Sequence, residues 1–270
     1  MSGLLEGLAF HKRDSVLHRL DPRVKLAYAF AMMIMAGIHN SMLPLLAMLV
    51  AQLPLAALGK VVKLWARTLR SSLPLALLIL GTNLLFTWLN KGPIDIYVVE
   101  RVLALAVRFL VFVASFSIFT LTTSPDDLSL ALEQMGVPYS FCFMFRAALR
   151  FTPVMAREAR TTIDAQRARG LELDKGGPIA RAKRYIPILI PLIVNAITRA
   201  WSMAEAMESR AWGATKKRTS LYVLKLGGRD YLALSATLFA LIMAFYAKFY
   251  FSFPYILPYI VSLLRSPQLT

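Results

Sequence analysis

Five stretches of this sequence are apolar over about the length that a helix needs to cross a lipid bilayer. A spanning helix takes about 20 mostly apolar residues, with a tolerated range of about 17–25. The stretches lie at 26–38, 43–58, 73–89, 102–122 and 231–253, and the first two are short. An apolar tail at 255–264 is a sixth partial span, a re-entrant segment or an interfacial one. The pattern predicts an all-α polytopic membrane protein with about five to six transmembrane helices.

The composition agrees with a membrane protein and excludes several other classes. Of the residues, 57% are hydrophobic and 17% are charged, whereas globular domains have roughly 45–50% apolar and about 25% charged residues. This apolar excess argues against disorder, and the single cysteine, Cys142, excludes a disulfide scaffold. The formal net charge of +16 would suggest a nucleic-acid partner for a soluble protein. Basic cytoplasmic loops explain it here, so no nucleic-acid partner is predicted.

Basic residues cluster on one side of the predicted spans. The N-terminal segment and the link after the second span are basic, and seventeen Lys and Arg residues lie between residues 124 and 230. Because basic loops stay in the cytoplasm, we expect a cytoplasmic N-terminus and a large cytoplasmic insertion. The predicted division of the chain is a cytoplasmic N-terminal segment (1–23), a four-span membrane domain (24–123), a cytoplasmic coupling region (124–228) and the C-terminal span or spans (229–270).

The cytoplasmic region is expected to hold two long helices. Ser124 followed by Pro125 and two acidic residues is a helix start signal, and it predicts a short helix to Gln134. A long helix is expected from Tyr139 to about residue 169, with a kink at Pro153 and a stop at Gly170. Its basic residues form one helical stripe. Another long helix is expected from Pro178 to about residue 210.

The middle of the second long helix, residues 185–198, is apolar and could be read as a further span. It is about fourteen residues long, contains Pro187 and Pro191, and has basic clusters on both sides. A span would place one of these clusters outside, against the charge rule. We therefore expect an interfacial or protein-buried segment, with partial membrane insertion as the alternative.

The two long helices end in similar heptapeptides. Residues 164–170 read DAQRARG and residues 205–211 read EAMESRA, at an offset of 41 positions. An arginine at a helix C-terminus is favourable by itself, so one such ending would mean little. Small neighbours leave each guanidinium projecting from a narrow tip, which can enter an acidic groove and form bidentate bonds. Two similar tips suggest two similar grooves and hence a dimeric partner. The candidate residues are Ala168, Arg169, Gly170, Ser209, Arg210 and Ala211.

Four motifs of this sequence, and their order along the chain, resemble the transmembrane T component (EcfT/CbiQ-like) of energy-coupling factor transporters, a class of ABC-type importers. The endings resemble its Ala-Arg-Gly signatures. The other matches are HRLDPRVKL at 18–26, TTSPDDL at 122–128 with Leu132 and GVP at 136–138, and RFTP at 150–153. The resemblance runs from about residue 10 to residue 250. The sequence departs from the signature at Ser209 and Ala211, while Arg210 remains.

The resemblance implies a role as a coupling subunit without catalysis or cofactors of its own. Two ABC ATPases would bind ATP, and one would dock on each of Arg169 and Arg210. Their closure would move the helix tips and change the angle between the two long helices. A small membrane S component, which binds a vitamin or metal ion, would sit on the apolar face at Ile188, Leu189, Leu192 and Ile193. Such a subunit lies in the plasma membrane of a prokaryote. The same aliphatic run would equally suit ordinary contact with the bilayer.

Two other function classes compete with this interpretation. A membrane enzyme would need nucleophiles, paired acids or metal ligands at membrane depth, but the three histidines are dispersed and no phosphate-binding Gly-Lys loop is present. A self-contained secondary transporter or channel would need polar groups in broken helices, and Asn83 and Arg108 are the notable candidates. We expect Arg108 to reach the membrane surface or to face other helices.

Overall fold

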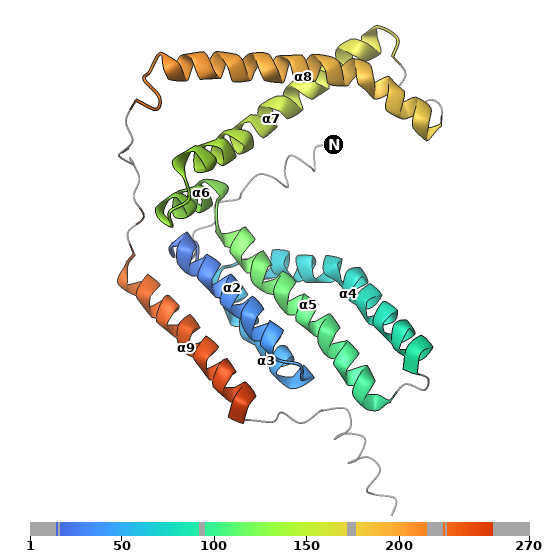
Figure 1. The fold of residues 1–270 in the computed structure, drawn as a ribbon, viewed down its shortest axis with the longest axis vertical. Coiled ribbons are helices and arrows are strands. Elements are labelled where there is room, and N and C mark those ends of the chain that lie inside the picture. Colours follow the sequence, from blue (N-terminus) through green and yellow to red (C-terminus); the bar gives the residue numbers. More distant parts are fainter. Residues whose placement is uncertain are drawn as a thin grey trace, which may run out of the picture. The chain divides into compact units, whose positions relative to one another are not determined.

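The computed structural model describes residues 15, 17–91, 95–171, 177–214, 224 and 226–250. The described residues contain helices and no strands. The helices are α2 (Pro22–Ile38), α3 (Met42–Leu58), α4 (Val62–Lys91), α5 (Ile96–Thr122), α6 (Pro125–Gln134), α7 (Tyr139–Ala168), α8 (Pro178–Glu208) and α9 (Gly228–Tyr250). They are labelled in Figure 1. The chain divides into two compact units, and the larger one combines residues 7–132 with 224–270. Residues 133–223 belong to the other unit.

Helix α5 is the centre of the larger unit, because α2, α3 and α4 all pack against it. Helix α9 packs against α2, and Figure 1 shows these two helices side by side. The core between α2, α3 and α5 consists of apolar side chains and includes Met32, Ala36, Leu45 and Val111, with a second small residue at Ala104. Small residues at such contacts let helix backbones approach closely, which is the usual packing mode of membrane helices.

Four helices among the described residues are long and apolar enough to cross a membrane, and these are α4, α5, α8 (within 183–208) and α9. Helix α3 is a shorter apolar helix. The predicted spans at 73–89 and 102–122 lie within α4 and α5, and the described part of the span predicted at 231–253 lies within α9. The two short stretches lie within α2 and α3. Helix α8 also qualifies by length and composition, so the interfacial placement of 185–198 stays a prediction. The tail at 255–264 lies outside the described residues.

Helix α4 begins at Val62, eleven residues before the apolar stretch on which its prediction rested. Lys63, Arg67 and Arg70 occupy this first part. The polar residues interrupt the apolar pattern, but they are good helix formers and no glycine breaks the run. An apolar-length criterion therefore located the span but not the helix start.

The ends of the helices in this unit are tied by polar side chains. Asp21 caps α2, accepting a hydrogen bond of 2.9 Å from the Arg23 backbone N–H. The Lys25 ammonium is buried and donates to the backbone oxygens of His18 at 3.2 Å and Thr122 at 2.9 Å. The sequence signature at 18–26 thus has a structural task, because it joins the start of α2 to the end of α5.

Arg108, on α5, faces the end of α2, which agrees with the expectation that it faces other helices. Its guanidinium donates to the backbone oxygen of His39 at 2.6 Å and to Asn40 Oδ1 at 2.9 Å. It thereby pairs with one backbone oxygen and one side-chain oxygen directly after the end of α2. Arg108, which was also the candidate for a transport path, thus links α5 to the turn between α2 and α3.

Helix α6 starts as its sequence predicts. The Ser124 hydroxyl oxygen accepts a hydrogen bond of 3.1 Å from the Asp127 backbone N–H, and the hydroxyl itself lies 2.6 Å from Asp127 Oδ2. This reciprocal arrangement between a serine cap and an acidic residue three positions later closes the start of the helix.

Candidate functional site

The C-terminal tip of α7 is a Schellman motif. Gly170 has a positive φ of 86° and its backbone N–H donates to the Arg167 oxygen at 2.9 Å. The Leu171 N–H donates to the Gln166 oxygen at 3.0 Å. These two bonds satisfy carbonyl groups that the last helical turn leaves open, and they require a left-handed residue at position 170. The predicted helix stop at Gly170 is confirmed.

The tip of α8 repeats the same bonds 41 positions later. The Ala211 N–H donates to the Glu208 oxygen at 2.9 Å and the Trp212 N–H to the Met207 oxygen at 3.0 Å. Ala211 takes the left-handed conformation, with φ of 56°. For a residue with a Cβ this costs roughly 1–2 kcal/mol. The heptapeptide repeat in the sequence is therefore also a repeat in three dimensions, despite the departure from glycine.

Arg169 and Arg210 occupy equivalent places, each directly before the left-handed residue of its tip. The six candidate residues at 168–170 and 209–211 are all exposed. Among the described residues, neither guanidinium forms a salt bridge. Each tip thus presents an arginine between small residues to the outside, as the sequence predicted. A charged planar group on a narrow exposed end suits bidentate binding in an acidic groove.

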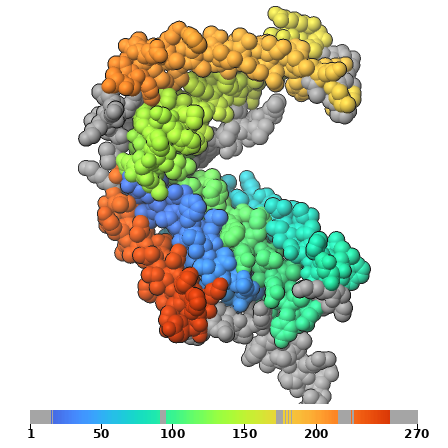
Figure 2. All heavy atoms as spheres, viewed as in Figure 1, coloured from blue at the N-terminus to red at the C-terminus, as the bar shows by residue number. Residues whose placement is uncertain are grey.

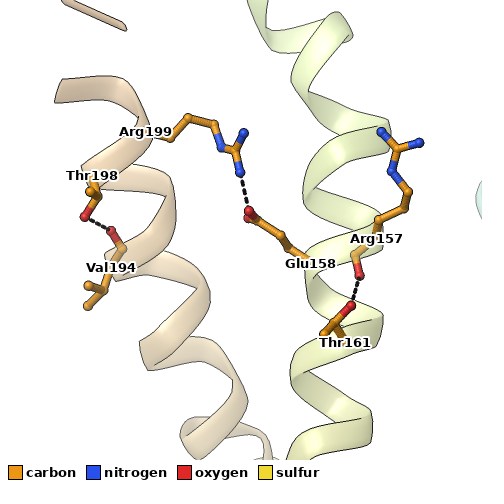
Figure 3. A network of polar contacts seen from close by, with 6 residues as sticks. All are labelled: Arg157, Glu158, Thr161, Val194, Thr198 and Arg199. Carbon is orange, nitrogen blue, oxygen red and sulfur yellow. Dashed lines mark hydrogen bonds and ion pairs between the residues drawn. The ribbon is translucent and has the colours of Figure 1, made fainter. Parts of the chain in front are cut away.

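Helices α7 and α8 run in opposite directions and touch at three levels along their lengths. Near the middle, the Arg199 guanidinium forms a salt bridge with Glu158 (Figure 3). Toward the α7 tip, the Gln166 side chain donates to the Pro187 backbone oxygen at 3.3 Å. In Figure 1 the two helices cross. Because the helices are antiparallel, the two tips lie at opposite ends of the pair.

An aromatic cluster provides the third level of contact. Trp212, directly after the α8 tip, lies 4.5 Å from Phe143 and 5.4 Å from Tyr139 between ring centroids. Both partners belong to the first turns of α7. Tilted rings at these distances attract each other beyond the area they bury. The α8 tip is therefore braced against the start of α7.

The first turns of α7 also hold an ion pair and a buried thiol. Arg146 binds Glu133 at 2.7 Å, and its guanidinium carbon lies 5.9 Å from the centre of the Tyr139 ring. Cys142 is 1% exposed. Burial raises the pKa of its thiol, the Glu133 carboxylate raises it further, and Arg146 lowers it. The thiol therefore remains protonated, as in a structural cysteine.

Of the four residues proposed for the apolar face of α8, two are fully on the exposed surface. Leu189 is 54% and Ile193 is 50% exposed, and Leu192 is half-buried. Ile188 is only 3% exposed, so the structure does not present it on the surface. The face continues instead through residues that the sequence reasoning did not include, Ile197 and Trp201. Their spacing from Ile193, of four and eight positions, could have identified them. Figure 2 shows α8 as the yellow-to-orange band.

Sequence reasoning also missed Glu158, Arg199 and Trp212 as contact residues. Glu158 and Arg199 carry opposite charges at equivalent positions of the two helices, 41 positions apart like the tips, but this offset does not predict a contact. In the part of the chain that the structure describes, no group of three or more His, Cys, Asp and Glu side chains could hold a metal ion.

Comparisons with known proteins show the family of this chain. Residues 13–221 match the cobalt transport protein family, CbiQ. The chain is similar to proteins named energy-coupling factor transporter transmembrane protein EcfT. The one from Leuconostoc gelidum is 33% identical over 241 residues, which are 83% of this chain and 89% of the relative. Those from Brevibacillus brevis and Staphylococcus aureus are 34% and 32% identical, over 80% and 82% of this chain and 88% and 89% of each relative. The chain therefore belongs to the CbiQ/EcfT family of transmembrane components of energy-coupling factor transporters.

Proposed function

We propose that this chain transmits the motion of two cytoplasmic ABC ATPases to a substrate-binding S component, and so drives uptake of a vitamin or metal ion. The observation that carries the proposal is the structural repeat of the two tips, each with an exposed arginine before a left-handed residue. Two equivalent tips at opposite ends of one helix pair match a partner with two equivalent grooves. ATP is bound by that partner and not by this chain.

The remaining parts of the proposal follow from the same arrangement. Each ATPase takes one tip, Arg169 or Arg210. The S component rests on the exposed apolar face of α8, which includes Leu189 and Ile193. The flanking basic clusters favour a cytoplasmic placement of α7 and α8 and of the N-terminus. The chain itself stays in the plasma membrane of a prokaryote.

The first experiment is isolation of the tagged chain from its native membrane in mild detergent, with its partners identified by mass spectrometry. We expect two ABC ATPase chains and one small hydrophobic protein. The double variant Arg169→Glu/Arg210→Glu should lose the ATPases and retain membrane insertion. A matched control, Arg150→Glu/Arg157→Glu, reverses the same number of charges on exposed positions of α7 away from the tip.

The two variants separate tip docking from general charge attraction. Loss of ATPases from the tip variant alone supports the proposal. Equal loss from both variants would show that overall charge and not the tips holds the partner. Recovery of the native chain alone, well folded, would contradict the coupling role as a whole.

A further inference from the structure

The salt bridge between Glu158 and Arg199 lies at the same distance from both tips along the chain. Glu158 is eleven positions before Arg169, and Arg199 is eleven positions before Arg210. At 1.5 Å of helix rise per residue, each tip arginine is about 16 Å from the pair. The two helices therefore extend equal arms in opposite directions from one ion pair.

The other contacts between α7 and α8 lie on either side of this pair. On one side, the side chain of Gln166, which lies between the pair and the α7 tip, donates to the Pro187 backbone oxygen. On the other side Trp212, at the tip of α8, packs on Tyr139 and Phe143. If the tips approached each other by a change in the crossing angle, both flanking contacts would open together. The central pair would separate least, because on both helices it lies between the two other contacts.

The chemistry of the pair suits a contact that persists while the helices turn. The Arg199 side chain is 38% and the Glu158 side chain 27% exposed. In addition to the bonded atoms, Arg199 Nε and Glu158 Oε2 are buried and have no hydrogen-bond partner. A guanidinium and a carboxylate can exchange which of their atoms meet without losing the ion pair. The ring contacts of Trp212 depend instead on a particular packing geometry.

We propose that Glu158 and Arg199 are positioning residues that form the pivot about which α7 and α8 turn when the tips move. The inference rests on the proposed function, because it is the ATPases that would move the tips. Beyond that function, the inference states that the Glu158–Arg199 ion pair stays closed during the motion. The Gln166 and Trp212 contacts between the helices open.

Distances between spin labels in the complex with its ATPases test the pivot directly. Cys142 is first replaced by alanine, so that only introduced cysteines are labelled. One label pair replaces Ala165 and Ala206, about one turn before the tips and outside the six candidate docking residues, and the other replaces Arg157 and Thr198 beside the ion pair. All four positions are exposed. Distances are measured without nucleotide and with ATP and vanadate.

We expect the tip-to-tip distance to change on addition of ATP and vanadate, and the distance beside the ion pair to stay constant. If both distances change to a similar extent, the ion pair is not the pivot. If no ATPase is recovered with the chain, or if the tip distance does not respond, the proposed function fails and not only the pivot. The two failures are thus distinguishable.

Variants of the pair provide a second test, with the tip labels as the readout. Glu158→Gln should broaden the distribution of tip-to-tip distances, and the reversed pair Glu158→Arg/Arg199→Glu should make it narrow again. Arg157→Gln is the matched control, because it removes a charge from the neighbouring position, which points away from Arg199 in Figure 3. An unchanged distribution in Glu158→Gln, or a reversed pair as broad as the single variant, would overturn the proposal.

Discussion

The backbone N–H of Asp21 donates a hydrogen bond of 2.8 Å to Oδ1 of Asp230, although 209 positions separate them in the sequence. Asp230 Oδ2 also accepts from the Gly227 N–H at 2.8 Å. One carboxylate therefore caps the start of α9 and fastens it to the start of α2. Both aspartates are buried, so the link is shielded from water.

Asp230→Ala should destabilise the membrane unit by about 1–3 kcal/mol, because it leaves the buried Asp21 N–H without a partner. The thermal midpoint in detergent measures this loss. Asp230→Asn keeps an oxygen acceptor at the same place and should lose less. Equal midpoints for Asp230→Ala and the native chain would show that the bond does not hold α9.

Ala211→Gly should stabilise the α8 tip by roughly 1 kcal/mol, because glycine adopts the left-handed conformation without the Cβ penalty. Gly170→Ala should destabilise the α7 tip by a similar amount for the same reason. Hydrogen exchange of the amides at 170–171 and 211–212 measures both effects locally. Opposite signs for the two substitutions are required, and the same sign in both would contradict the equivalence of the tips.

Trp212→Ala should free the α8 tip from the start of α7. It removes two aromatic contacts, each worth about 0.5–1.5 kcal/mol beyond the area that they bury. Because Trp212 is only 38% exposed, the burial of most of its side chain is lost as well. The expected result is faster amide exchange in the first turns of α7 and at 209–212. Trp212→Phe retains a ring and should have a smaller effect. Unchanged exchange at Tyr139 and Phe143 in the alanine variant would exclude the brace.

The Cys142 thiol should react slowly with maleimide at neutral pH. Its pKa is raised by burial and by Glu133, so less of the reactive thiolate is present at a given pH than for a free cysteine. The rate should increase to that of a free thiol when the protein is unfolded. A cysteine at position 168 in a Cys142→Ala background is the exposed control. Equal rates for the two positions in the folded protein would show that Cys142 is accessible.

Lysine at the tips should only partly replace arginine. Arg169→Lys/Arg210→Lys retains both charges, but it loses the planar group that can form two parallel bonds to a carboxylate. ATPase recovery with this variant should fall between that of the native chain and that of the charge-reversed variant. Recovery of the ATPases at the native level would mean that their grooves require only the positive charge and not the planar guanidinium.

Much of the fold was predictable because its signals are local. The spans follow from apolar length, and the start of α6 follows from Ser124 and the acidic residue three positions later. The two tips follow from a heptapeptide repeat, since a Schellman ending is formed by bonds within six residues. These features need no knowledge of how distant segments pack.

The sequence by itself determined the apolar spans, the start of α6 and the two arginine tips. Only the tertiary structure decided that Ile188 is buried while Ile197 and Trp201 extend the exposed face of α8. It also decided that Arg108 holds the α2–α3 turn, that Asp21 meets Asp230 and that Glu158 meets Arg199. The reason is physical. Helix formation depends on neighbours in sequence, whereas a pairing between helices depends on their crossing and rotation, which the side chains of both helices set together.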